Sequence, residues 1–146
     1  MNRKFWFYTV LILLLLVLAA CSSENQKTAK STENEIATIM NFVPPAEITN
    51  DNTSLFADNG IGGISFGKII SGTIDKPQTA TVLTDEECVM DEKGVTHCFN
   101  NIKLENGNEI RVNNLHVMEK VPCLSPDEKV QIELADNNYA KITRNM

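Results

Sequence analysis

Residues 95–118, VTHCFNNIKLENGNEIRVNNLHVM, decide the fold that this sequence predicts. They contain two runs with β-branched and apolar residues, 95–104 and 109–118, on either side of the dipeptide Asn106-Gly107. Asn-Gly is a strong hairpin signal, because both residues tolerate the positive φ that tight turns between strands require. The stretch is therefore expected to form an antiparallel hairpin.

The apolar pattern selects a register for this hairpin. A two-residue turn would place the apolar side chains of the two strands on opposite faces of the sheet. A three-residue loop, residues 106–108, pairs Leu104 with Ile110. Ile102 then pairs with Val112, and the apolar side chains share one face. A slip of one residue turns every side chain over, so we expect the three-residue loop.

Further short strands are expected around the hairpin. Apolar or β-branched runs between turn signals place them at 64–74, 79–84, 130–134 and 139–143. The glycine-rich stretch 60–63 indicates a bend into the first of these strands, because it lacks the Gly-Lys-Ser/Thr ending of a phosphate-binding loop. The expected strands are short, and no stretch after the export signal shows the 3.6-residue apolar period of a long helix. This favours a mainly β domain, a small antiparallel β-barrel or sandwich of OB-like or SH3-like type.

The chain begins with the parts of an export signal. Arg3 and Lys4 form a basic start, and residues 5–20 are apolar except for one threonine. This apolar stretch is shorter than the roughly 20 residues of a membrane-spanning helix. It ends in two alanines before Cys21, as a cleavage site of a secretory signal does. We therefore expect residues 1–20 to be a signal peptide.

Leu18-Ala19-Ala20-Cys21 resembles the lipobox of bacterial lipoproteins, a resemblance confined to the first two dozen residues. It implies that Cys21 receives a diacylglycerol thioether and becomes the mature N-terminus. Two acyl chains anchor a protein durably where one does not. The resemblance therefore implies a lipid anchor on the extracytoplasmic face of the cell membrane, or in the outer membrane of a diderm source.

Residues 21–45 are expected to hold the lipidated cysteine and a flexible, disordered tether, since they are rich in Ser, Thr, Asn, Glu and Lys. Residues 46–146 then form a single β-domain with one modest core. Loss of residues 1–20 leaves 11 Lys and Arg against 19 Asp and Glu, a net charge of −8. An acidic domain of this kind is not drawn to nucleic acid or to anionic lipid headgroups.

The main functional signal is a set of soft metal ligands within 36 residues: Cys88, His97, Cys98, His116, Met118 and Cys123. A type I turn ending in Gly94 pairs Cys88 directly with Cys98. The register chosen above continues to place Cys98 opposite His116. Met118 would follow on the same face, with Cys123 folding back over it, while His97 and Phe99 point to the other face.

This pattern supports two hypotheses. In the first, two cysteines form a disulfide in an oxidising compartment, and the domain is a binding or structural module with an envelope protein as partner. Cys88–Cys98 is the local pairing, and Cys98–Cys123 or Cys88–Cys123 would close a longer loop. Each choice leaves one thiol unpaired.

In the second hypothesis, Cys98, His116 and Met118, joined by Cys88 or Cys123, bind copper or zinc. An enzyme is the least favoured class. The chain has no Cys-x-x-Cys motif, and the acidic residues 85–87 would raise the pKa of a neighbouring thiol rather than lower it.

Overall fold

The computed structural model describes residues 41–145, so the expected signal peptide, Cys21 and most of the expected tether lie outside the described residues. Within residues 41–145 there are six strands: β1 (Ile64–Ser71), β2 (Gln78–Met90), β3 (Thr96–Leu104), β4 (Glu109–His116), β5 (Lys129–Ala135) and β6 (Tyr139–Arg144). Three short 3₁₀ helices accompany them: η1 (Thr53–Phe56), η2 (Ile61–Gly63) and η3 (Asp136–Asn138). None of the helices in residues 41–145 is long and apolar enough to cross a membrane.

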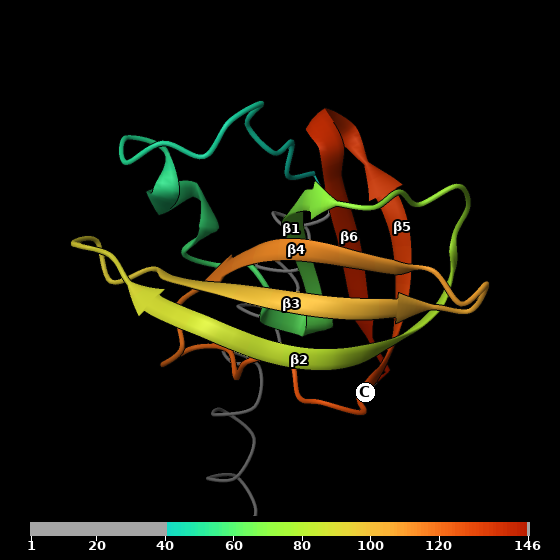
Figure 1. Cartoon of the computed structure of the whole chain (residues 1–146). Coiled ribbons are helices and arrows are strands. Elements are labelled where there is room, and N and C mark those ends of the chain that lie inside the picture. The colour runs from blue at the N-terminus through green and yellow to red at the C-terminus, as the bar shows by residue number, and fades with distance from the viewer. Residues whose placement is uncertain (1–40, 146) are drawn as a thin grey trace, which may run out of the picture. The chain divides into compact units, whose positions relative to one another are not determined.

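The strands form a closed barrel in the order β1-β4-β3-β2-β5-β6, with every neighbouring pair antiparallel. Figure 1 shows β2, β3 and β4 crossing in front of the steeply inclined β1, β6 and β5. Because β5 returns by a long connection to lie beside β2, strands β2 to β5 form a Greek key. The expected mainly β fold is confirmed, as a barrel with one strand more than the five of an OB fold.

The barrel interior changes in character along its length. One part is filled by apolar side chains from all six strands, including Val82, Ile102, Val112, Val130 and Ile142. Towards the ends of β3 and β4 that carry Thr96 and His116, the buried side chains become polar: Thr96, Asn100, Asn114 and His116. The apolar part supplies most of the burial that stabilises the fold. The polar part is where the candidate site lies.

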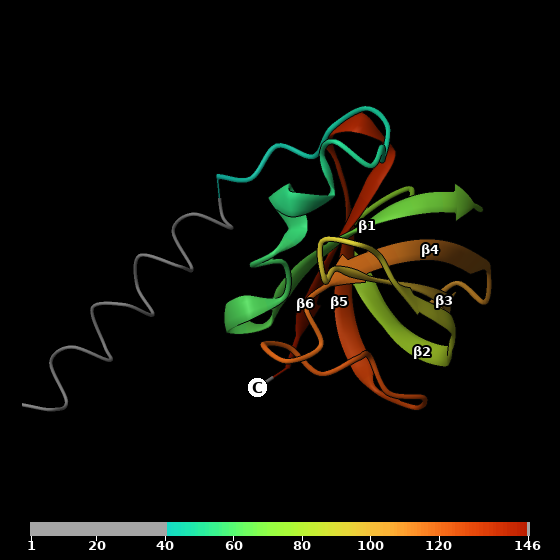
Figure 2. The ribbon, with the colours of Figure 1, turned by 90° about the vertical axis from the view of Figure 1, so that its left-hand side faces the viewer.

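Residues 41–63 cover the outer face of part of the barrel, so strands there are buried on both sides. Phe56, Ile64, Phe66, Leu115 and Tyr139 form a second apolar cluster with this segment. Figure 2 shows the segment, teal to green, along one side of the strands. Phe42 packs against Phe56 and Phe66, with ring centroids 5.3 and 5.2 Å apart. The packed domain therefore includes Phe42, four residues before the expected start at 46.

The second hairpin differs from its expected register by two residues. Ile102 pairs with Ile110. Across the turn, the Leu104 N–H donates to the Asn108 carbonyl and the Leu104 carbonyl accepts from the Gly107 N–H. The loop has three residues, as expected, but they are 105–107, with Gly107 at φ +88°. A shift of two residues keeps each side chain on its face. The single apolar face is therefore confirmed, while the exact partners are not.

Asn59 ties the covering segment to the barrel. Its side chain accepts from the backbone N–H of Phe66 (2.7 Å) and donates to the carbonyl of the same residue (3.0 Å). It also donates to the carbonyl of Leu115 and to Asn114 Oδ1. The asparagine is buried and joins β1 to β4 where glycines 60, 62 and 63, all at positive φ, turn the chain into β1. That bend confirms the interpretation of the glycine-rich stretch.

We predict that Asn59→Ala lowers the free energy of unfolding by about 2 kcal/mol, because it leaves buried backbone groups without partners. Urea denaturation would measure the loss. Asn50→Ala, at an exposed position, is the matched control and should change stability by less than about 0.5 kcal/mol. Equal stability of the two variants would contradict the role given to Asn59.

Candidate functional site

Cys88 and Cys98 form a disulfide between β2 and β3, with Cα atoms 4.2 Å apart and a sequence separation of ten residues. The expected local pairing is therefore the one present. The hairpin register pairs Met90 with Thr96 and Val89 with His97. Next to them the ladder is irregular, since β2 has two residues, Glu87 and Cys88, opposite Cys98 alone. Such a bulge re-aims side chains locally.

Two irregularities in β2 bring an acidic residue to the same site. The first lies between Val82 and Thr84 and puts Asp85 opposite Asn100, whose side chain is buried inside the barrel. Asn100 donates a hydrogen bond of 2.8 Å to Asp85 Oδ1. The other carboxylate oxygen of Asp85 lies 3.6 Å from Cys88 Sγ. Sequence reasoning treated Asp85 only as a neighbour of Cys88 along the chain and missed it as a member of the site.

Cys123 comes to the site on the loop 117–128, which covers this end of the barrel. Val121 and Leu124 are buried on either side of it and anchor the loop. Arg144 at the end of β6 donates to the carbonyls of Pro122 (2.9 Å) and Cys123 (2.8 Å). The expectation that Cys123 folds back over the cluster is confirmed.

His116 lies beside Cys123. The imidazole is almost fully buried, and its Nε2 is 3.5 Å from Cys123 Sγ, whereas its Nδ1 has no hydrogen-bond partner. Burial lowers the pKa of His116. Burial, followed by the charge of Asp85, raises the pKa of the Cys123 thiol. Both shifts favour the neutral forms, so the pair is a thiol next to a neutral imidazole and not a thiolate–imidazolium pair.

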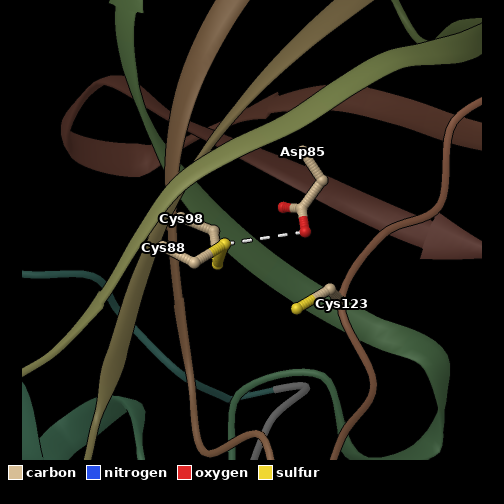
Figure 3. A group of neighbouring side chains, drawn as sticks. All are labelled: Asp85, Cys88, Cys98 and Cys123. Atoms are coloured by element: carbon tan, nitrogen blue, oxygen red, sulfur yellow. Dashed lines mark hydrogen bonds between the residues drawn. A yellow bond between two sulfur atoms is a disulfide. The ribbon is translucent and has the colours of Figure 1, made fainter.

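Figure 3 shows the resulting group, in which the Cys123 side chain points towards the disulfide and the Asp85 carboxylate contacts Cys88 Sγ. The ligand atoms of Asp85, Cys88, Cys98 and Cys123 all lie within 4.8 Å of one another. Carboxylate oxygen and sulfur at such distances, with an imidazole adjacent, form a cluster that could bind a metal ion.

Two of the expected placements around this cluster differ in the structure. Met118 lies beyond the end of β4 and its side chain is 54% exposed, because β4 ends at His116 and its alternation ends with it. Cys98 pairs with Asn114, and His116 pairs with Thr96, so Cys98 and His116 share a face without being directly opposite. His97 is on the other face, as expected, and its Nε2 is 3.2 Å from Asp91 Oδ2.

Comparison of the chain with protein-family models, with curated proteins and with solved structures gives no match.

The loop that carries Cys123 also depends on an ion pair, which gives a pH prediction. Arg144 binds Glu128 through two contacts of 2.6 and 2.8 Å, and these hydrogen bonds hold the pKa of Glu128 below its ordinary value. A lowered carboxylate pKa stabilises the fold above the unfolded-state pKa, about 4.3 for Glu, and this stabilisation is lost as pH falls through the folded-state pKa.

We therefore predict that Glu128→Gln costs about 1.5 kcal/mol of unfolding free energy at pH 7. At an acid pH below the folded-state pKa of Glu128 its cost should be smaller, because the wild-type carboxylate is then protonated and no longer pairs with Arg144 as a charge. Urea unfolding at the two pH values measures the difference. Glu92→Gln, at an exposed position of the first turn, is the control. A cost that is the same at both pH values would contradict this role of the ion pair.

Proposed function

We propose that this protein is a lipid-anchored, extracytoplasmic module that supports or binds an envelope protein and has no catalytic activity. The Cys88–Cys98 disulfide carries the proposal, because structural disulfides persist in oxidising compartments and are rare in the cytosol. It agrees with the export signal and the lipobox-like sequence before Cys21. The acidic charge of the chain favours a basic or neutral partner surface.

The disulfide also holds in place a pair of exposed apolar side chains that are suited to binding a protein partner. Immediately beyond it, the β2–β3 hairpin exposes two large apolar side chains, Val89 (66%) and Met90 (69%). The bridge on one side and the Asp91 turn on the other restrict their motion, since Asp91 Oδ1 accepts from the backbone N–H groups of Lys93 and Val95 at 2.9 Å. Apolar side chains held in a rigid loop lose little entropy on binding.

We predict that Cys21→Ser releases the full chain from the membrane fraction and abolishes incorporation of labelled palmitate. Cys123→Ser, the same substitution at a cysteine outside the lipobox-like sequence, should retain both. Deletion of residues 2–20 should retain the protein in the cytosol with Cys88 and Cys98 reduced, as alkylation of acid-quenched cells would measure. Palmitate incorporation into the Cys21→Ser chain, or a disulfide in the chain without the signal, would refute the proposal.

The geometry also favours a second candidate function, soft-metal binding by the reduced protein. A disulfide sulfur is a poor ligand, whereas reduction of the bridge gives two thiolates beside Cys123. Thiolates with an imidazole, here that of His116, select zinc or Cu(I). The observation that favours this function is the spacing of the three sulfurs within 4.8 Å, together with the 3.5 Å contact of His116 Nε2 with Cys123.

For this candidate, we predict that the reduced full chain, with Cys21→Ser to remove the fourth thiol, binds one Zn²⁺ or Cu⁺ ion in competition with a chromophoric chelator. The oxidised chain should bind at least tenfold more weakly, as should a reduced chain with Cys123→Ser and His116→Ala. Met118→Leu and His97→Gln, outside the cluster, should bind as the parent does. Unchanged affinity after the double substitution would exclude this site, provided circular dichroism shows the barrel fold.

A further inference from the structure

We propose that Cys123 exchanges with the Cys88–Cys98 disulfide, so that the domain alternates between two bridges, Cys88–Cys98 and Cys98–Cys123, and the free thiol moves to Cys88. The freed Cys88 is then a site for a mixed disulfide with a disulfide-bearing protein partner. This inference depends on the sulfur geometry and does not require the lipid anchor or a metal ion.

The observation behind it is a third sulfur within reach of both sulfurs of a disulfide. Cys123 Sγ lies within 4.8 Å of Cys88 Sγ and of Cys98 Sγ. Figure 3 shows the Cys123 side chain directed towards the bridge, with no labelled side chain between them. Arg144 and the buried Val121 and Leu124 hold the loop in this place. Exchange proceeds by attack of a thiolate on a disulfide sulfur, so the reacting groups are already neighbours.

The step balances within the chain. The Cys123 thiolate attacks Cys98 Sγ, a Cys98–Cys123 bond forms, and the Cys88–Cys98 bond breaks. Cys88 leaves with the electron pair and takes up the proton that Cys123 gave up. His116 Nε2, at 3.5 Å from Cys123 Sγ, is placed to accept that proton first. The number of disulfides and thiols stays the same, so no oxidant or reductant is needed.

Burial decides which of the two bridge sulfurs leaves. Cys98 is fully buried, whereas Cys88 is exposed on the β2 bulge. A thiolate leaving at Cys88 is solvated, while one leaving at Cys98 would be an unpaired buried charge. As a thiol, Cys88 can donate a hydrogen bond to Asp85 Oδ2, 3.6 Å away, which a bridged sulfur without a proton cannot do. Exchange therefore transfers the thiol from the half-buried loop to the exposed hairpin.

The partner step balances in the same way. The Cys88 thiolate attacks a disulfide of the partner, forms a mixed disulfide with one partner sulfur, and releases the other as a thiolate. The Cys98–Cys123 bridge keeps the barrel end closed while Cys88 is occupied.

The test uses the folded full chain with Cys21→Ser, which then has three cysteines, one bridge and one thiol. Iodoacetamide is added in mildly alkaline buffer, samples are quenched in acid over time, and peptides are mapped without reduction. We expect molecules with alkylated Cys88 and a Cys98–Cys123 bridge to accumulate beside those with alkylated Cys123. An aromatic disulfide in place of iodoacetamide should give the mixed disulfide at Cys88.

Two serine variants complete the test. Cys88→Ser should oxidise to a Cys98–Cys123 bridge with no free thiol and a mass lower by two hydrogens than its reduced form. Cys123→Ser should keep the Cys88–Cys98 bridge and remain unlabelled at Cys88. Labelling of the Cys21→Ser parent at Cys123 alone would overturn the proposal. Comparable labelling of all three cysteines would also overturn it, because only unfolded chains expose Cys98.

Discussion

Closure of the sheet between β1 and β6 is the constraint on which the rest of the structure depends. A closed sheet has no free edge, and the inward side chains of all six strands share one interior. In this barrel the interior is apolar around Ile102 and polar around His116. The polar end is covered by the loop 117–128. A cysteine on that loop therefore meets side chains from β2, β3 and β4, which closure has already gathered.

The irregularities of β2 determine which side chains are gathered. Val82 pairs with Ile102, and that register continued without a bulge would place Cys88 opposite Thr96. Each of the two irregularities advances β2 by one residue, so that Cys88 reaches Cys98 instead. Between the two irregularities, the β2 side chains that would point outward point inward instead. Asp85 therefore faces the interior and accepts a hydrogen bond from Asn100. The disulfide and the carboxylate of the site are thus two consequences of the same departure from regular pleating.

The sequence was sufficient for the mainly β class and the strand positions, and it indicated Cys88–Cys98 as the local one of three possible pairings, because turn dipeptides and alternation are local signals. This local pairing is indicated because no irregularity of the ladder lies between the Asp91–Gly94 turn and Val89. Strand order, the bulges and the covering segment depend on contacts distant in sequence, which no local pattern encodes. Met118 was misplaced because alternation was continued beyond His116, where β4 ends. Asp85 was missed because its inward orientation exists only with the bulges.

The anchoring of the 117–128 loop by Arg144 also has a kinetic consequence. Cys88 and Cys98 are ten residues apart, so their encounter closes a short loop with a small loss of chain entropy. Cys123 gains its position only after β6 has docked and Arg144 has bound the carbonyls of residues 122 and 123. A chain emerging from its N-terminus therefore forms the hairpin bridge before the third cysteine has a fixed place. The order of emergence, rather than relative bond strength, selects the bridge with which the newly folded barrel begins.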